Sequence, residues 1–356
     1  MRKLLEELML ELLKAYSPTG YEEKAVKRYV EIVGSIGIGR VYVDEVGNAI
    51  VDCGEGNSRW VLLAGHIDTV PGELPVSYDG NIFKGRGAVD AKGPLVAMTV
   101  GALEASRHVG SGCRVTVAAL VGEEGRSPGA RALINDMINK GVRPSAIIVG
   151  EPSGCDGVVI GYRGSIKLRL KCVGSGGHSS DPNRGVSAIE ELINLWLGMK
   201  SLSTSLQVSI GMNYIRGGEA FSVIPRECEA LLDIRIPVDQ GLPMIRSKII
   251  EYISSSSSRC VPEMVEETPP VKVSVNTPIV RALIRSIIRN GLRPIPSIKL
   301  GTSDMNLLVN LTNNIVSYGP GKPELSHTDY EEISINELEL GAKVYRDAVI
   351  EYCSIT

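Results

Sequence analysis

The feature that most constrains this chain is a buried strand that ends in ionisable side chains. The apolar run Val61–Gly65 ends at a glycine and has the composition of a buried strand. His66 and Asp68 follow it, and residues i and i+2 of an extended chain point to the same face. Further on, the glycine-punctuated segment GRGAVDAKG presents Asp90 at the start of a predicted helix. Histidine and aspartate bind zinc-type metals, and a carboxylate can bridge two ions.

Two other predicted strands also end in carboxylates. Glu123 and Glu124 follow the apolar run VTVAALVG, and Glu151 follows the strand predicted at 145–149. Carboxylates at the end of a buried strand are costly to desolvate unless a cation compensates for the lost hydration. The alternative is a pair of solvated loop residues, which the neighbouring HxD and GRGxxD segments make less favourable. His327, in the loop ELSHT, supplies a second histidine.

Together these residues provide enough ligands for two metal ions. The predicted ligands are His66, Asp90, Glu124, Glu151 and His327. Adjacent residues at a strand end point to different sides, so one of the two glutamates can bind metal while Glu123 acts as general base on a cation-bound water. Asp68 is placed to orient the His66 ring. A metal-binding protein without turnover is the competing hypothesis, and Glu123 argues against it because a structural site needs no spare base.

The order of predicted elements indicates an α/β fold. Helices are predicted at 2–16, 91–107, 127–140, 277–289 and 335–352, and strands at 48–53, 114–121, 145–149, 295–299 and 315–318. Such alternation is typical of a mostly parallel sheet with helices on both faces, whose ligands collect at the carboxyl ends of the strands.

The pattern changes at Tyr162. The segment IKLRLKC alternates apolar and charged residues, as a half-exposed antiparallel strand does. A helix to Met199, a strand at 206–211, a strand at 227–236, a helix at 242–254 and a closing strand at 271–275 follow. We therefore predict an inserted α+β domain at 162–273 and a catalytic domain made of 1–161 and 274–356. The serine run 254–258 has the composition of a solvated linker.

Composition excludes several classes of partner and location. The chain has 356 residues, 43% of them hydrophobic, and a net charge of −3, which favours neither nucleic acid nor an anionic membrane. Acidic residues interrupt the apolar N-terminus, and no run approaches a membrane span, so a cytoplasmic protein is expected. The seven cysteines form no CxxC pair and are predicted to be reduced, although a hyperthermophilic source would permit disulfides.

The ordered motifs GHIDTVP, GRGAVDAKG, GEEG, GEPS and SHTD resemble those of the di-zinc family of aminoacylases, acetylornithine deacetylases and succinyl-diaminopimelate desuccinylases. The resemblance covers essentially the whole chain. It implies that Asp90 bridges two divalent ions, zinc or alternatively cobalt, with His66 and Glu151 at one and Glu124 and His327 at the other. It also implies a cis peptide after Asp90 and a proton relay through Glu123.

The same resemblance assigns roles in the inserted domain, which it implies is a lid and dimerisation domain of a homodimer. His178 matches a histidine that reaches the partner subunit's active site and stabilises the tetrahedral oxyanion. Asn213 and Arg235 match substrate-contacting positions, and an arginine fork suits an α-carboxylate. Gly301, Thr302 and Ser303 would offer donors to the same end of the substrate.

Within the family, the segments GELPV, GRGAVDAKGPL and GYRGSI are most similar to members that release lysine or ornithine from the amino-group carrier protein LysW. The resemblance thus implies an amide hydrolase of lysine and arginine biosynthesis, acting on a carrier-protein conjugate. Deacylation of small N-acyl amino acids, namely N-acetylornithine or N-succinyl-diaminopimelate, is the nearest alternative. A dipeptidase or carboxypeptidase is a further one.

Overall fold

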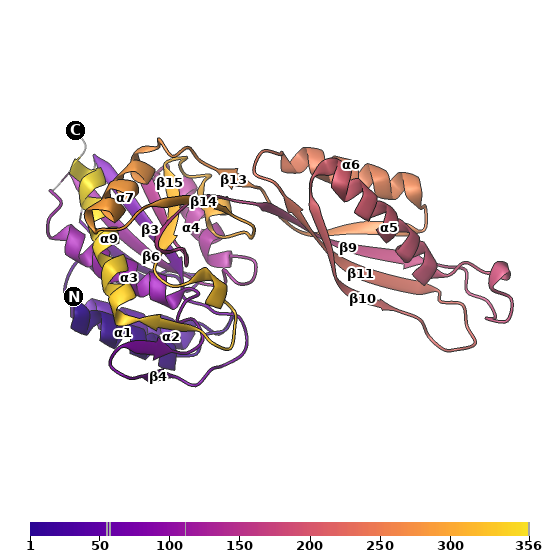
Figure 1. Cartoon of the computed structure of the whole chain (residues 1–356), viewed down its shortest axis with the longest axis horizontal. Coiled ribbons are helices and arrows are strands. Elements are labelled where there is room, and N and C mark those ends of the chain that lie inside the picture. Colours follow the sequence, from indigo (N-terminus) through magenta and orange to yellow (C-terminus); the bar gives the residue numbers. More distant parts are fainter. Residues whose placement is uncertain (55, 57, 111, 355–356) are drawn as a thin grey trace. The chain divides into compact units, whose positions relative to one another are not determined.

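A computed structural model describes residues 1–54, 56, 58–110 and 112–354 of the chain. The chain divides into two compact units (Figure 1). Unit 1 contains Met1–Gly161, Val273–Ile298 and the residues from Ser303 onward, whereas unit 2 contains Tyr162–Lys272 and Lys299–Thr302. The lid and dimerisation roles of the inserted segment stay predictions.

The core of unit 1 is a mixed sheet. Its strands are β1 (Arg40–Val43), β2 (Ala49–Cys53), β3 (Arg59–His66), β6 (Cys113–Leu120), β7 (Ala146–Gly150), β8 (Gly154–Tyr162), β14 (Ile295–Lys299) and β15 (Ile315–Gly319). The order β1-β2-β6-β3-β7-β15-β8 places the parallel strands β6, β3, β7 and β15 at the centre and antiparallel strands at the sides. The central strands are buried apolar runs, as a sheet covered on both faces requires. The predicted α/β fold is confirmed.

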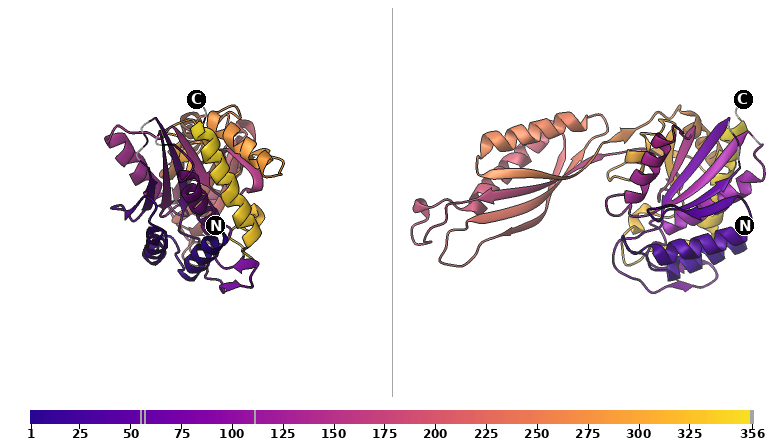
Figure 2. Two further views of the ribbon diagram at one scale, coloured as in Figure 1. Left: turned by 90° about the vertical axis from the view of Figure 1, so that its left-hand side faces the viewer. Right: turned by 180° about the vertical axis from the view of Figure 1, so that it is seen from behind.

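Helices cover both faces of this sheet. They are α1 (Arg2–Lys14), α2 (Glu23–Ser35), α3 (Lys92–Ser106), α4 (Pro128–Asn139), α7 (Pro278–Arg289), α8 (Met305–Leu308) and α9 (Ile335–Ser354). Figure 2 (left) shows α7 and α9 on one side of the sheet and α4 on the other. Helix α3 is buried along most of its length and packs against α9, and a side chain at Gly101 would meet the Ala342 carbonyl oxygen at 2.6 Å. The small residues of α3 therefore permit close helix packing.

A small sheet that the sequence analysis missed joins distant segments of unit 1. Its strands are β4 (Ser77–Tyr78), β5 (Ile82–Lys84) and β16 (Glu332–Ser334). Strand β16 pairs with β5, which brings the loop after His327 next to the segment before Asp90. These strands are too short to give a periodic sequence pattern, because periodicity needs four or more residues to be visible.

Unit 2 is an antiparallel sheet with two helices on one face (Figure 1). Its elements are β9 (Gly164–Val173), α5 (Ala188–Leu206), β10 (Ser209–Gly217), β11 (Glu227–Ile236), α6 (Leu242–Ser256) and β12 (Cys260–Thr268), with the short 3-10 turn Pro182–Arg184. The strand order is β10-β11-β9-β12. In β9 Ile166 and Leu168 are buried and Lys167 is exposed, so the predicted alternation is confirmed. So is the predicted antiparallel sheet with two helices.

Three predicted boundaries in this unit were wrong. Helix α5 runs past Met199 to Leu206, because its buried stripe continues, and β10 begins only at Ser209. Part of the serine run lies in the last turn of α6, which ends at Ser256, so only Ser257 and Ser258 of the run belong to the connection between α6 and β12. The closing strand is the two-residue β13 (Val271–Lys272), while the nine-residue β12 was missed.

The prediction that all cysteines are reduced is wrong for four of them. Cys113 on β6 bonds to Cys353 on α9, and Cys172 on β9 bonds to Cys260, its direct neighbour on β12. These partners are 240 and 88 residues apart, so no local spacing could reveal them. The other three cysteines are free in the part of the chain that is described.

Candidate active site

The topology of unit 1 gathers the predicted ligands at one edge of the sheet. Strand β3 runs parallel to β6 and β7, and its residue Gly65 lies opposite Gly150, the last residue of β7. His66 therefore ends β3 where Glu151 leaves β7, and Glu123 follows the end of β6 at the same edge. These side chains lie close together because each one follows the end of a strand, and the ends of parallel strands meet at the same edge of the sheet.

Asp90 lies between the two histidines. Its Oδ1 atom is 3.2 Å from His66 Nε2, and its Oδ2 atom is 3.3 Å from His327 Nε2. His327 Nε2 also lies 2.7 Å from Glu124 Oε1. Two ligand groups result, His66 with Asp90 and Glu151, and Asp90 with Glu124 and His327, each with donor atoms within 4.8 Å of one another. One carboxylate thus faces two sets of nitrogen and oxygen donors.

This donor set fits two divalent ions. Each group offers one imidazole nitrogen and two carboxylates, which suits zinc, and the two groups share the carboxylate that would bridge them. The peptide bond between Asp90 and Ala91 is cis, as the family resemblance predicted.

The histidines and Asp90 stabilise one another electrostatically. Burial lowers the pKa of His66, but hydrogen bonds with Asp68 and Asp90 outweigh it and leave that pKa well above the ordinary value. The hydrogen bond with Asp90, followed by that with Glu124, raises the pKa of His327 to about 10. Burial alone would raise the pKa of Asp90, yet the two histidines hold it well below the ordinary value. The pocket therefore stabilises positive charge beside Asp90.

Two other carboxyl groups of the site have strongly raised pKa values. Burial and the charge of Glu151 raise the pKa of Glu123 well above its ordinary value. The pKa of Glu151 is raised mainly by burial. Glu123 also forms a third close group with His66 and Glu124. A carboxyl group whose pKa is raised, and which lies next to residues that could bind metal, is suited to general acid–base work.

The contacts of Asp68 differ in detail from a simple histidine–carboxylate pair. His66 Nδ1 lies 3.0 Å from the Asp68 carbonyl oxygen and 3.4 Å from its Oδ1 atom. The carboxylate accepts hydrogen bonds from the backbone N–H groups of Glu123 and Glu124, at 3.0 and 3.1 Å, and from the Thr19 hydroxyl, at 2.7 Å. Asp68 therefore links β3 to the loop that carries both glutamates.

Sequence reasoning missed several residues that support the site. Buried Lys92 donates to the Leu12 and Ala15 carbonyl oxygens, and burial lowers its pKa to about 7. The missed residues are Thr19, Arg86, Lys92, Asp304 and Glu331. Arg86 and Lys92 lie within the GRGAVDAKG motif, which could have drawn attention to them, whereas no local pattern points to the other three.

Ser303 and Asp304 belong to unit 1 and are buried. The Ser303 hydroxyl accepts a hydrogen bond from the Met305 N–H at 3.2 Å, so it is engaged within its own turn. Burial raises the pKa of Asp304 to about 6.

The other predicted residues lie in unit 2, and their roles remain predictions. They are His178, Asn213, Arg235, Gly301 and Thr302. His178 is exposed, and its Nδ1 atom accepts a hydrogen bond from the Ser180 N–H at 3.1 Å. The Arg235 fork donates to Asp233 Oδ2 through Nε and Nη2, at 3.1 and 2.7 Å, and the Ser165 hydroxyl donates to the other Asp233 oxygen. Asn213 lies at the bulge of β10.

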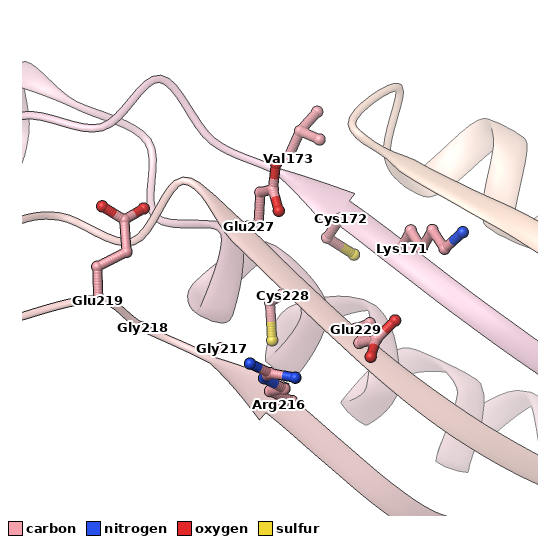
Figure 3. Close-up of a pocket in the computed structure, with 10 residues that line it drawn as sticks. All are labelled: Lys171, Cys172, Val173, Arg216, Gly217, Gly218, Glu219, Glu227, Cys228 and Glu229. Atoms are coloured by element: carbon pink, nitrogen blue, oxygen red, sulfur yellow. The ribbon is translucent and has the colours of Figure 1, made fainter.

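Unit 2 also contains a cavity of about 640 Å³ beside the ends of β9, β10 and β11 (Figure 3). The lining side chains carry charges of both signs. The charged ones are Lys171, Arg216, Glu219, Glu227 and Glu229, and Cys172 and Cys228 also line the cavity. No histidine is among the lining residues described, so this cavity lacks the donor set found in unit 1.

The sequence profile of Peptidase family M20/M25/M40 matches residues 62–351. The chain belongs to this family. A LysW-lysine/LysW-ornithine hydrolase of Sulfurisphaera tokodaii is 36% identical over 354 residues, covering 99% of this chain and 96% of the relative. A hydrolase of the same name from Saccharolobus solfataricus is also 36% identical, and the match covers 97% of this chain and 95% of the relative. Membership of this family and similarity to these hydrolases show that the M20 chain is a metal-dependent hydrolase of amide bonds.

Solved structures of the family share the fold of this M20 chain. The aminopeptidase PepT of Bacillus cereus superposes with a TM-score of 0.82 at 20% identity, covering 100% and 99% of the two chains. The metallo-carboxypeptidase Sso-CP2 of Sulfolobus solfataricus gives 0.80 at 17% identity, covering 98% of each. Among the described helices, none is long and apolar enough to cross a membrane.

Proposed function

We propose that this M20 hydrolase releases lysine or ornithine from the amino-group carrier protein LysW. The observation that carries the proposal is the identity of 36% to hydrolases of that name, which extends over at least 95% of both chains. A similarity that includes unit 2 as well as unit 1 supports a shared substrate and not only shared hydrolytic chemistry.

We further propose that two divalent ions, zinc or cobalt, bind at the sheet edge of unit 1. Asp90 would contact both ions, with His66 and Glu151 at one and Glu124 and His327 at the other. The shared position of Asp90 between two donor groups supports this arrangement. Ions bound there would lower the pKa of a water molecule and withdraw electrons from the amide carbonyl.

Glu123 is the proposed general base and acid. It would take the proton of the attacking water and deliver it to the nitrogen of the leaving amine. Its raised pKa and its proximity to His66 and Glu124 support this role. Asp68 would act as a positioning residue, because its carboxylate fixes the backbone of Glu123 and Glu124.

Five residues are proposed to hold the amino-acid part of the substrate. Arg235 is proposed to bind the α-carboxylate of the lysine or ornithine, with Asn213, Gly301, Thr302 and Ser303 contacting the same end of the substrate. The fixed Arg235–Asp233 pair supports this, since a pre-oriented fork loses less entropy on binding.

His178 would stabilise the oxyanion from a partner subunit, which makes a homodimer part of the proposal. The exposed position of His178 outside unit 1 is compatible with such a role.

The test is amine release by the zinc-loaded protein on LysW-lysine, LysW-ornithine, N-acetylornithine and N-succinyl-diaminopimelate, measured in parallel. Preferential cleavage of the LysW conjugates would support the proposal. Preference for a small N-acyl amino acid would refute the carrier protein as substrate while keeping the chemistry. Cleavage of dipeptides alone would identify a peptidase instead.

A further inference from the structure

An ion pair buried in unit 1 connects the two loops that supply Asp90 and His327. Arg86 is 5% exposed, the Glu331 side chain is fully buried, and Arg86 Nη1 lies 2.8 Å from Glu331 Oε1. Arg86 precedes Asp90 in the GRGAVDAKG segment, and Glu331 follows His327 in the C-terminal loop. Neither side chain belongs to the two ligand groups.

The pair is bonded to the backbone on both sides. Glu331 Oε2 accepts hydrogen bonds from the Gly87 N–H at 2.7 Å and the Val89 N–H at 3.3 Å, which holds the residue next to Asp90. Arg86 Nη1 donates to the carbonyl oxygen of Thr328, the residue after His327, at 2.8 Å. Arg86 Nε donates to the Gly72 carbonyl oxygen at 2.8 Å. Each loop is therefore fastened within one residue of its ligand.

His327 needs such support more than the ligands on the sheet do. Its φ of +63° lies in the left-handed region, which a residue with a side chain occupies only when its surroundings hold it there. His66 is the last residue of β3, and Glu151 follows β7 directly, so paired strands fix both of them. The loop that carries His327 has the Arg86–Thr328 bond and the β16–β5 pairing instead.

We propose that the Arg86–Glu331 pair positions Asp90 against His327 and thereby sets the affinity of the ion that these two residues would share with Glu124. The inference rests on the proposed two-metal site. Both residues are positioning residues, because neither side chain belongs to a ligand group. Outer-shell partners of metal ligands typically change metal affinity 10- to 100-fold when they are removed.

The test is a competition titration of the metal-free protein with Zn²⁺ in the presence of a chelator, which yields a dissociation constant for each ion. Glu331→Gln removes the negative charge and one of the two acceptor oxygens. Arg86→Lys keeps the positive charge but loses the guanidinium group, which donates to the Gly72 and Thr328 carbonyl oxygens and to the Glu331 carboxylate at once. In both variants we expect one of the two dissociation constants to rise about 10- to 100-fold and the other to change less. Arg86→Lys also carries the test if Glu331→Gln does not fold.

The matched control is Asp52→Asn, which breaks another ion pair of unit 1, that between Arg114 Nη2 and Asp52 Oδ2 at 2.5 Å. This control should lower the melting temperature without changing either dissociation constant. The inference would be overturned if folded Arg86→Lys and Glu331→Gln variants had unchanged affinities for both ions. It would also be overturned if the control lost as much metal affinity as these variants. The titration needs no substrate, so a wrong assignment of LysW leaves it intact, whereas wild-type protein that binds a single ion would overturn the two-metal site itself.

Discussion

Asp90 is the residue on which both halves of the cluster depend, because its two carboxylate oxygens face different histidines. The candidate ligands on either side come from separate segments of the chain. A residue with a single oxygen ligand could not serve both groups. The chemistry of the site therefore depends on how accurately this one side chain is held.

The first prediction at this scale concerns Glu123. Glu123→Gln should lower kcat by about 10²- to 10⁴-fold, because the amide can neither accept nor deliver the proton. Binding of both ions should persist, since Glu123 belongs to neither of the two groups built around Asp90. Amine release and metal titration of the same preparation check this. Activity that survives the substitution would show that another group transfers the proton.

A second prediction concerns the Thr19 hydroxyl, which donates to Asp68 at 2.7 Å. Thr19→Val should lower kcat by about tenfold, or about 1.4 kcal/mol in the activation barrier, because the carboxylate that orients Glu123 loses one donor. KM should change little.

Thr69→Val is the matched control for Thr19. Thr69 is buried next to the same segment, and its hydroxyl has no hydrogen-bond partner among the described residues. The Thr69→Val substitution should therefore leave kcat unchanged. Equal losses in the two variants would indicate a packing effect rather than positioning of Asp68.

At the scale of elements, unit 1 is reinforced where its last helix meets the sheet. The disulfide between Cys113 and Cys353 joins β6 to the end of α9, and Arg59 on β3 donates to the Tyr352 carbonyl oxygen at 2.7 Å. Helix α9 thus covers the sheet and is anchored to it at its C-terminal end.

The corresponding prediction is that Cys353→Ser lowers the free energy of unfolding by about 2–5 kcal/mol without loss of kcat at moderate temperature. Thermal melting without reductant should show the loss. In the presence of reductant the variant and the wild type should melt together, because both then lack the crosslinks. Cys155→Ser, at a free cysteine, should behave as the wild type in both conditions. A variant that melts like the wild type without reductant would show that the bond does not stabilise the protein.

The elements themselves were largely predictable. Most helices and strands of unit 1, and β9 and β11 in unit 2, follow from hydrophobic periods of 3.6 and 2, which are local properties. The failures have physical causes: β4, β5 and β16 are too short to show a period, and α5 continues through a serine-rich stretch because tertiary packing buries Leu206.

At the scale of the whole molecule, the proposed homodimer predicts that two inactive variants complement each other. His178→Ala and Glu123→Ala subunits should each be inactive. When mixed and allowed to exchange, they should recover about a quarter of wild-type activity, because half the dimers are mixed and each contains one intact site. Activity measured against mixing ratio tests this, with each variant incubated alone as the control. Absence of recovery, despite exchange of labelled subunits, would refute a His178 that acts in trans.

The sequence by itself determined the class of fold and predicted which residues could bind metal, because strand ends, glycine turns and carboxylates after apolar strands are each visible in a short segment. Only the tertiary structure decided how those residues are held. Arg86 and Glu331 are 245 residues apart, and Cys113 and Cys353 are 240 apart. Such pairs meet only when the sheet and its covering helices have formed, and nothing in either local segment specifies the partner.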